Sequence, residues 1–418
     1  MATFALLTHP DQHRRTLALP GGPVWWAFCA AAALALGAFS SLGPHRVWGV
    51  AAALGYTAAA VLAALGRSPR TAGAAAVTGA VLLPLLVLLA VDRAQLEVDV
   101  VARSAGLLLS EGTPYLERPA APEDFNPYLP GMAAFGIPEA VAGPGPLTDP
   151  RLWMGAAFLG AFALALPAGT RREPARWIAA CPLVALPLAV GGVDLPVAGL
   201  MCLGLARAGQ GRAGPAGLAL GLAAALKWTA WPAVPVALAL LAATSGRGGQ
   251  RANRAAFVGD GRRKSGAALR CGLVVLLTAA ALVLPAALRD PGAFRTHVVD
   301  FPLGLTGAVS SAASPLPGHL LATHVPGGRT LALLLLGVSA LLLALSLLVR
   351  PPATAAAAAA RLALGLLLAI VFMPATRFGY LVHPLVLMAW AVARQASAHS
   401  VLEERARAHV RARKQAIR

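Results

Sequence analysis

The chain has 418 residues, of which 58% are hydrophobic and 12% are charged. Together with a mean hydropathy of +0.69, this composition excludes an ordinary water-soluble protein and is typical of a polytopic membrane protein. The net charge of +18 does not indicate nucleic-acid binding, because the basic residues lie in short links between apolar runs and form no continuous surface. Retention of basic links on the cytoplasmic side of a membrane explains them better.

Apolar runs follow one another along most of the chain, and several reach the roughly 20 residues that a helix needs to cross about 30 Å of hydrocarbon. They predict an all-α, polytopic membrane bundle of about 11–12 spans within a transmembrane domain at 23–394, between cytoplasmic tails at 1–22 and 395–418. The first span is expected to stay uncleaved, with cleavage after its alanine-rich part left open. The expected spans are 23–42, 47–66, 72–91, 151–168, 176–190, 194–207, 214–226, 229–243, 270–288, 329–349, 357–374 and 378–394.

The links between these spans alternate between the two sides of the membrane. With a cytoplasmic N-terminus, the basic links fall inside, including the largest one at about 244–270. The same alternation puts the loops at about 92–150 and 289–328 on the outer face. Because both loops are rich in proline, we expect them to form re-entrant or surface-lying structure.

The first outer loop contains an acidic segment at 92–130, in a chain that is otherwise basic. Hydrophobic residues recur at helical spacing from Val98 to Leu109, and Gly112 is a natural helix stop, which predicts an amphipathic helix lying on the membrane surface. Asp99 and Arg103 are four residues apart on its polar side, where an ordinary ion pair is the alternative to a functional role. The segment holds seven of the seventeen carboxylates: Asp92, Glu97, Asp99, Glu111, Glu117, Glu123 and Asp124.

Charged residues beside spans are costly to bury and are therefore functional candidates. Lys227 lies between two apolar runs at the expected outer face, where it could meet a polyprenyl phosphate or simply extend to the interface. Asp194 opens a helix at the same face, where capping of the helix is the alternative. Arg377 suits phosphate recognition or interfacial anchoring, and Tyr380 and His383 follow it by one and two helical turns.

Other chemistries find no support in the sequence. Two histidines of the second outer loop, His297 and His319, lack metal-ligand spacing and are expected to be structural or solvent-facing. The four cysteines lie in or beside apolar runs without paired spacing and are expected to be core residues: Cys29, Cys181, Cys202 and Cys271. No phosphate-binding loop or serine-hydrolase motif occurs, so neither a metal nor another cofactor is expected.

Several stretches, in order, resemble bacterial glycosyltransferase family 87, the integral membrane mannosyltransferases of the GT-C superfamily that use polyprenyl-phosphate sugars. The resemblance covers about residues 90–394, although Val101 stands where the family often has an aromatic residue. It is carried by EVDVVARSAGLLLSEGTPYLE, FNPYLPGMAAFGIP, GGVDLPVAGLMCLGLA, AGLALGLAAALKWTAWPAVP, FPLGLTGAVSSAASPLPGHLL and RFGYLVHPLVL.

The resemblance implies a GT-C fold in a bacterial plasma membrane, with the active site open to the outer face. It implies an inverting transfer of a sugar to an envelope glycolipid or glycan, with mannose expected and arabinose as the alternative sugar. Asp99, or alternatively Glu97, would be the general base. Lys227 and Arg377 would stabilise the leaving phosphate, with Arg103 and His383 behind them. A transporter or lipid flippase is the leading alternative, and a non-catalytic membrane scaffold is a third.

Overall fold

The structure is a computed structural model that describes residues 21–167, 172–249, 260–308 and 312–396. Most of both predicted tails and part of the basic link at 244–270 therefore lie outside the described residues. Within the described ranges the chain is helical, and its β-structure is one isolated bridge between Ala313 and Thr376.

The main helices follow the order of the predicted spans. They are α1 (Pro23–Phe39), α2 (Gly43–Ala64), α3 (Pro69–Val77), α4 (Leu83–Ala90), α5 (Leu96–Glu111), α6 (Ile137–Ala142), α7 (Pro150–Ala165), α8 (Arg172–Ala180), α9 (Pro182–Val190), α10 (Asp194–Gly209), α11 (Ala213–Leu226), α12 (Ala233–Gly249), α13 (Asp260–Arg289), α14 (Pro291–Arg295), α15 (Pro317–His324), α16 (Gly328–Val349) and α17 (Ala355–Phe372). A last helix occupies 382–396.

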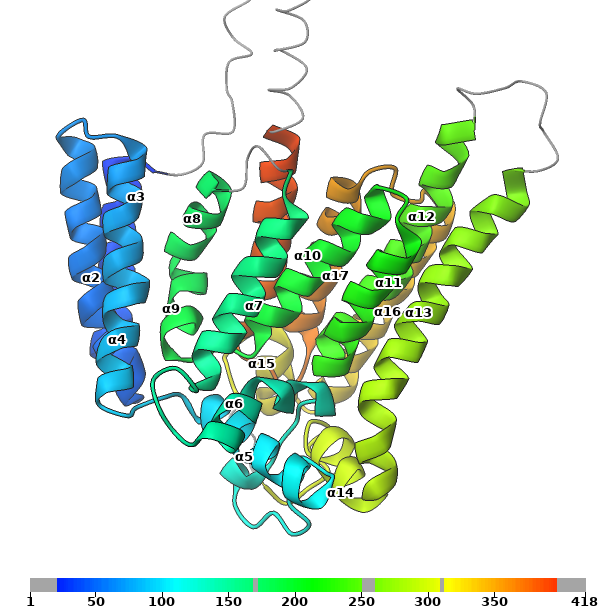
Figure 1. Ribbon diagram of the computed structural model, residues 1–418, viewed down its shortest axis with the longest axis horizontal. Coiled ribbons are helices and arrows are strands. Elements are labelled where there is room, and N and C mark those ends of the chain that lie inside the picture. Colours follow the sequence, from blue (N-terminus) through cyan, green and yellow to red (C-terminus); the bar gives the residue numbers. More distant parts are fainter. Residues whose placement is uncertain (1–20, 168–171, 250–259, 309–311, 397–418) are drawn as a thin grey trace, which may run out of the picture.

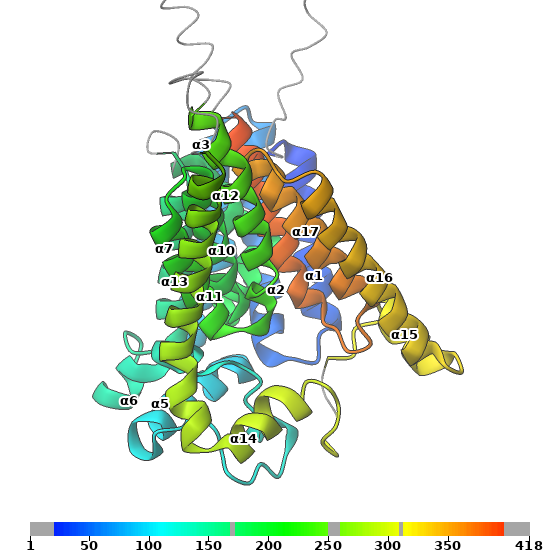
Figure 2. The ribbon, with the colours of Figure 1, turned by 90° about the vertical axis from the view of Figure 1, so that its right-hand side faces the viewer.

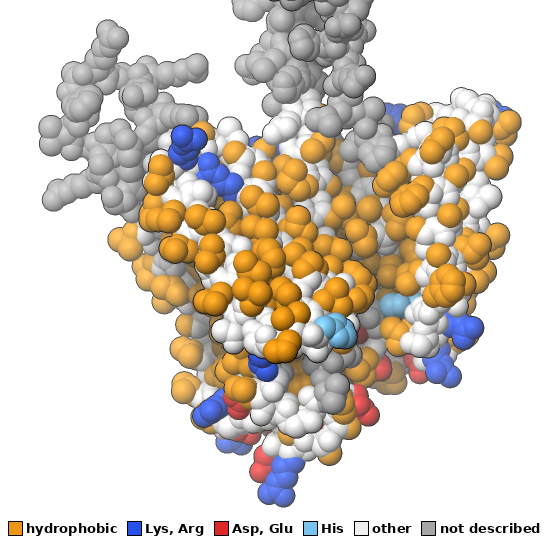
Figure 3. Space-filling view, turned by 180° about the vertical axis from the view of Figure 1, so that it is seen from behind, with side chains coloured by type: hydrophobic (Ala, Val, Ile, Leu, Met, Phe, Trp, Pro, Cys, Tyr) orange, Lys and Arg blue, Asp and Glu red, His pale blue; other side chains and the backbone are white. Residues whose placement is uncertain are grey.

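The long helices run side by side, and the short helices α5, α6 and α14 form a layer across one end of the bundle (Figure 1; Figure 2). We call this the α5 end. The space-filling view shows hydrophobic side chains over the middle of the bundle and acidic side chains only in its lower part, toward the α5 end (Figure 3). The two predicted outer loops, at about 92–150 and 289–328, therefore share one end of the molecule.

Five helices are long and apolar enough to cross a membrane by length and composition: α2, the continuous stretch Pro69–Ala90, the Gly266–Arg289 part of α13, α16 and α17. Shorter apolar helices, among them α1, α7 and α11, accompany them. Every predicted span contains helix in the structure. The prediction of an all-α, polytopic membrane bundle is confirmed, and α5 lies across the end of that bundle (Figure 1).

Two boundaries differ from the prediction. The segment expected as one span at 176–190 is two helices, because α8 ends at Ala180 and the chain turns at Cys181 before Pro182 opens α9. The helix expected to begin at 270 begins at Asp260, so α13 takes up much of the basic link. Basic side chains are good helix formers, and a charged sequence does not end a helix as proline or glycine does.

Close helix crossings hold α2 against the span that begins at α3. A β-carbon on Gly79 would lie 2.3 Å from the α-carbon of Gly55, so both positions require glycine for this approach. A π-helical segment, Thr78–Leu82, follows α3 and leads into Pro84. Pro84 has no N–H to offer the carbonyl of Ala80, and the indole N–H of Trp48 on α2 donates to that oxygen at 2.7 Å.

Helix α10 is the central element of the bundle and packs against α7, α11, α12 and α17. Most of its side chains are buried around the whole circumference, as expected for a helix surrounded by other helices. Three of the four cysteines, Cys29, Cys202 and Cys271, are buried, and all four are free. The position of α10 matters for function because its first residue, Asp194, lies at the α5 end.

Candidate functional site

The ends of three helical elements bring Asp194, Lys227 and His383 together at the α5 end. Asp194 begins α10, Lys227 follows the last residue of α11 in an extended conformation, and His383 lies in the first turn of the 382–396 helix. Lys227 Nζ donates to Asp194 Oδ1 at 2.6 Å, and His383 Nε2 lies 3.0 Å from the same oxygen. The Asp194 carboxylate therefore joins segments that are far apart in the sequence.

Burial distinguishes this group from surface ion pairs. Lys227 and His383 are 9% and 1% exposed. Val193 is the N-cap residue of α10, and the Asp194 carboxylate is bonded to Lys227 and His383, so Asp194 is not the helix cap that was its alternative role. The Lys227 ammonium group is likewise bound to a carboxylate within the protein. A buried charge pair is retained only where its partners satisfy it, because removal of one partner leaves an uncompensated charge in a poorly solvated site.

Two tyrosines flank the Lys227 ammonium group. Its Nζ lies 5.5 Å from the ring centre of Tyr128 and 4.8 Å from that of Tyr380. Rings at these distances attract a cation through the negative charge of their faces. Together with the Asp194 carboxylate, they fix the direction in which the ammonium group points.

A second ion pair joins α5 to the link before the last helix. Arg377 Nη1 donates to Glu97 Oε1 at 2.5 Å, with side-chain exposures of 34% for Arg377 and 14% for Glu97. The link is held by the bridge between Ala313 and Thr376, so the second outer loop supports Arg377. We call the whole group the polar cluster: Glu97, Tyr128, Asp194, Lys227, Arg377, Tyr380 and His383.

The polar cluster balances two carboxylates against one lysine and one arginine, with His383 in addition. The Nδ1 atom of His383 is buried and has no hydrogen-bond partner among the described residues. Such a cluster can exchange internal ion pairs for contacts with an anionic ligand, since a phosphate group offers more acceptor oxygens than a carboxylate. Among the described residues, no three His, Cys, Asp or Glu side chains are grouped to hold a metal ion.

A buried histidine, His297, holds together the segments that form the α5 end. The backbone N–H of Asn126 donates to His297 Nδ1 at 2.9 Å, and His297 Nε2 donates to the carbonyl oxygen of Leu116 at 2.8 Å. The ring is therefore the neutral tautomer with its proton on Nε2. Asn126 also donates to Ser104 on α5. These bonds hold α5, the 113–128 segment and the second outer loop together, and the expectation that His297 is structural is confirmed.

Asp99 and Arg103 do not join the polar cluster. Asp99 is exposed, and it forms no ion pair with any residue of the described ranges. Arg103 donates to the carbonyl oxygen of Glu123 at 2.8 Å, so the expected i,i+4 ion pair with Asp99 is absent there. Although the Asp99 side chain is exposed, neighbouring protein atoms displace part of the water around its carboxyl and raise its pKa, and the nearby Asp92 charge adds to this effect.

Sequence reasoning found most of the polar cluster and missed part of it. Lys227, Asp194, Arg377, Tyr380 and His383 were all predicted as binding residues, and the structure brings them together. Tyr128 was missed, because its contact with Lys227 depends on the path of an irregular loop. Glu97 was only an alternative to Asp99, since the spacing along α5 does not reveal which of the two faces Arg377.

Cavities of about 390 Å³ and 190 Å³ lie elsewhere in the molecule, and no residue of the polar cluster lines either of them. The smaller one lies between α10 and α11 and is lined mainly by leucines. The lysine and the arginine of the polar cluster are each paired with a carboxylate, so an anionic substrate would have to compete for them.

Comparisons with known proteins give one structural likeness. No family model matches the chain, and no curated protein matches it. Among solved structures, the crystal structure of ArnT from Cupriavidus metallidurans in the apo state is similar with a TM-score of 0.44 and 16% sequence identity, over 72% of this chain and 54% of that one. The chain thus spans about half the length of that protein. At these values the likeness identifies neither a shared family nor a shared activity.

Proposed function

We propose that this chain is an integral membrane glycosyltransferase of the GT-C type, which transfers a sugar, most simply mannose, from a polyprenyl-phosphate donor to an envelope glycolipid or glycan. The observation that carries the proposal is the polar cluster: two ion pairs and two tyrosines at the bundle end that also carries the surface-lying helix α5. The sequence resemblance to family 87 supports the same function, and the stretches that carry it include all seven residues of this cluster.

The chemistry proposed is one displacement with inversion. The acceptor hydroxyl oxygen forms a bond to the anomeric carbon while the bond from that carbon to the phosphate oxygen breaks. The lipid phosphate leaves with the electron pair, and the hydroxyl proton passes to a carboxylate of the protein. Lys227 and Arg377 can stabilise the leaving phosphate because both are cations held at the α5 end.

The geometry favours Glu97 over Asp99 as the base. Glu97 is the only α5 carboxylate among the described residues with an ion pair to a cation of the polar cluster. When the donor phosphate takes Arg377 as a bidentate partner, the Glu97 carboxylate loses that partner and becomes free to accept a proton. Asp99 lies outside the cluster, and its role as base is the alternative.

The positions of the charges favour an enzyme over the alternative of a transporter or flippase. Intramembrane transport sites usually lie near the bilayer midplane between repeats. Here Asp194, Lys227 and Arg377 are located at helix ends or in links. They could meet a headgroup at the membrane surface without a path through the bundle.

The test is transfer of labelled mannose from polyprenyl-phosphate mannose to membrane lipid acceptors by the purified protein in lipid nanodiscs. We expect Glu97→Gln to lower the rate by about 10²–10⁴-fold and Asp99→Asn to leave it within a few fold. The opposite pattern would make Asp99 the base. The acid limb of the pH–rate profile would then lie above the ordinary aspartate pKa of about 3.9, because the pKa of Asp99 is raised. Absence of transfer from any polyprenyl-phosphate sugar, together with movement of substrate across vesicles, would refute the enzyme.

A further inference from the structure

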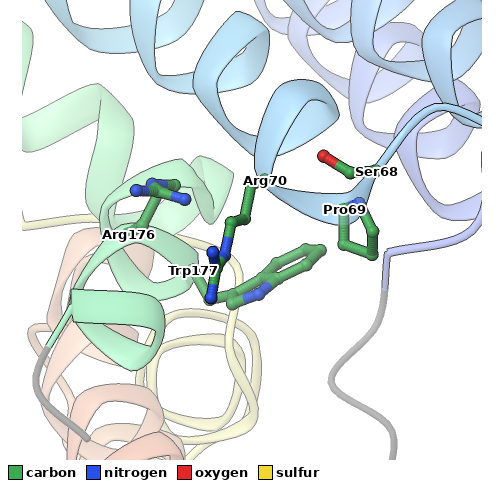
Figure 4. A pocket seen from close by; sticks show the side chains of 5 residues that line it. All are labelled: Ser68, Pro69, Arg70, Arg176 and Trp177. Carbon is green, nitrogen blue, oxygen red and sulfur yellow. The ribbon is translucent and has the colours of Figure 1, made fainter.

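The larger of the two cavities lies between the start of α3 and helix α8, at the end of the bundle opposite the polar cluster (Figure 1). It has a volume of about 390 Å³, within the range of roughly 300–1,000 Å³ that is common for small-molecule sites. Five side chains line it, as Figure 4 shows: Ser68, Pro69, Arg70, Arg176 and Trp177. Two of the five are arginines, and none is a carboxylate.

The arginines come from different helices. Arg70 lies in the first turn of α3, and Arg176 lies on α8. Arg176 packs beside Gly73 of α3, since a β-carbon at this position would lie 3.4 Å from Arg176 Cδ, at ordinary van der Waals distance. The stem of Arg176 thus runs beside the first turns of α3, which limits the positions that its guanidinium can take before any ligand arrives.

Trp177, which lines the cavity beside the two arginines, belongs to an aromatic stack. The Trp177 ring stacks on Trp26 with a centroid distance of 5.2 Å, and Trp26 stacks on Tyr56 at 5.9 Å. The hydroxyl of Tyr56 donates to the carbonyl oxygen of Ala180 at the end of α8. Trp177 is therefore a fixed, flat, apolar surface beside two cations, rather than a mobile surface side chain.

The position of the cavity along the bundle determines what it can meet. Ser68 caps α3 by accepting from the N–H of Thr71, and the apolar span Pro69–Ala90 begins directly after it. The cavity thus opens at the level where the hydrocarbon ends, the usual depth of tryptophan in membrane proteins. Phosphate groups of lipids lie at this depth, and paired guanidinium groups recognise phosphate oxygens through several parallel hydrogen bonds.

We propose that the cavity between α3 and α8 binds a phosphate-bearing anion, and that in the membrane this is the headgroup of an anionic phospholipid. Arg70 and Arg176 hold the phosphate, and Trp177 lies against the apolar part of the lipid next to it. Basic pockets between membrane helices bind anionic headgroups in this way. The site does not depend on the proposed glycosyl transfer, because it shares no residue with the polar cluster.

The experiment is native mass spectrometry of the full chain released from detergent with added phosphatidylglycerol or phosphatidylcholine. We expect tighter binding of phosphatidylglycerol, and an apparent dissociation constant raised about tenfold in the double variant Arg70→Gln/Arg176→Gln. Arg212→Gln is the matched control, because Arg212 is an exposed arginine in the link between α10 and α11, outside the cavity, and should bind as wild type does. Equal binding of both lipids by the wild type, or unchanged binding by the double variant, would overturn the proposal.

A second arm separates the two sources of phosphate. Inorganic phosphate is added to the delipidated protein, and the midpoint of thermal unfolding is measured for the same variants. An increase in the midpoint that the double variant loses and Arg212→Gln keeps assigns the site to soluble phosphate as well as lipid. If the double variant is not recovered folded, Arg176→Lys replaces it: it keeps the charge but loses the planar fork, so weaker phosphatidylglycerol binding is expected and unchanged binding contradicts the proposal.

Discussion

Arg377 and Glu97 are separated by 280 positions in the sequence and meet at 2.5 Å across the α5 end. This ion pair links α5 directly to the segment between α17 and the 382–396 helix. Because the arginine side of the pair is partly exposed to solvent, its contribution to the unfolding free energy is modest, and the pair also positions α5.

A double-mutant cycle on Glu97→Gln and Arg377→Gln tests this link. We expect the two substitutions together to cost less than the sum of the single ones, with a coupling free energy of about 1 kcal/mol, because each single change already breaks the pair. Thermal unfolding of the purified protein at low and high salt measures the coupling. Strictly additive effects would mean that the contact contributes nothing to the stability of the folded chain.

Removing one charge of the Asp194–Lys227 pair should destabilise the protein more than removing both. Lys227→Met leaves the Asp194 carboxylate in a buried site with only His383 beside it, and we expect a loss of about 3 kcal/mol in unfolding free energy. The double variant Asp194→Leu/Lys227→Met removes both charges and should be more stable than Lys227→Met alone. Denaturant unfolding followed by tryptophan fluorescence measures both. A double variant less stable than both Asp194→Leu and Lys227→Met would contradict a buried pair.

His297 should make the stability of the α5 end depend on pH. Burial lowers the pKa of His297 below its usual value of about 6.5, and Arg103 adds to this effect. The unfolded chain therefore binds more protons than the folded one just below pH 6.5, so the stability contribution is complete above this pH and is lost as the pH falls. Protonation of Nδ1 would also break its bond from the Asn126 N–H.

The measurement compares the unfolding midpoint at pH 7.5 and pH 5.5 for wild type and His297→Gln. We expect the wild type to lose more stability on acidification than the variant, although the variant starts from a lower midpoint. His319→Gln is the control, because within the described residues the His319 ring forms one hydrogen bond, with the carbonyl oxygen of Pro374, and it is less buried than His297. The same loss in wild type and His297→Gln would assign the pH dependence to other groups.

Glycine substitutions test the crossing of α2 with the π-helical segment. Gly79→Ala places a β-carbon 2.3 Å from the α-carbon of Gly55, so the helices must separate, and we expect a loss of about 1–3 kcal/mol. Gly337→Ala on α16 is the matched control, since a β-carbon there meets nothing within 4 Å. That change should be neutral or slightly stabilising, because alanine is the better helix former. Equal effects at the two positions would argue against the close approach.

The sequence was sufficient for the helices and for the end of the bundle on which function is expected. Hydrophobic run length located the spans, and helical spacing with Gly112 located α5, whose last residue is Glu111. These signals are local. The residues of the polar cluster were found because charges beside apolar runs are costly, a rule that needs no knowledge of the fold.

Contacts between distant segments were beyond this reasoning. Glu97 and Asp99 lie on different sides of α5, and only the packing of α5 on the bundle decides which one meets Arg377. The role of Asp194 was misread in part for the same reason, because helix capping is a local explanation whereas Lys227 and His383 arrive from other helices. Tyr128 and Asn126, which donates to His297, lie in an irregular loop that carries no periodic signal.

The two hydrogen bonds of His297 also set an order for the assembly of the protein. Asn126 and Leu116 precede His297 by 171 and 181 positions, respectively, and the whole of α7 to α13 is made in between. During synthesis, α5 and the loop that follows it must wait for the 291–300 segment to reach the same side of the membrane before the layer can close. The proposed transferase surface is thus completed late, after most of the bundle that supports it has been inserted.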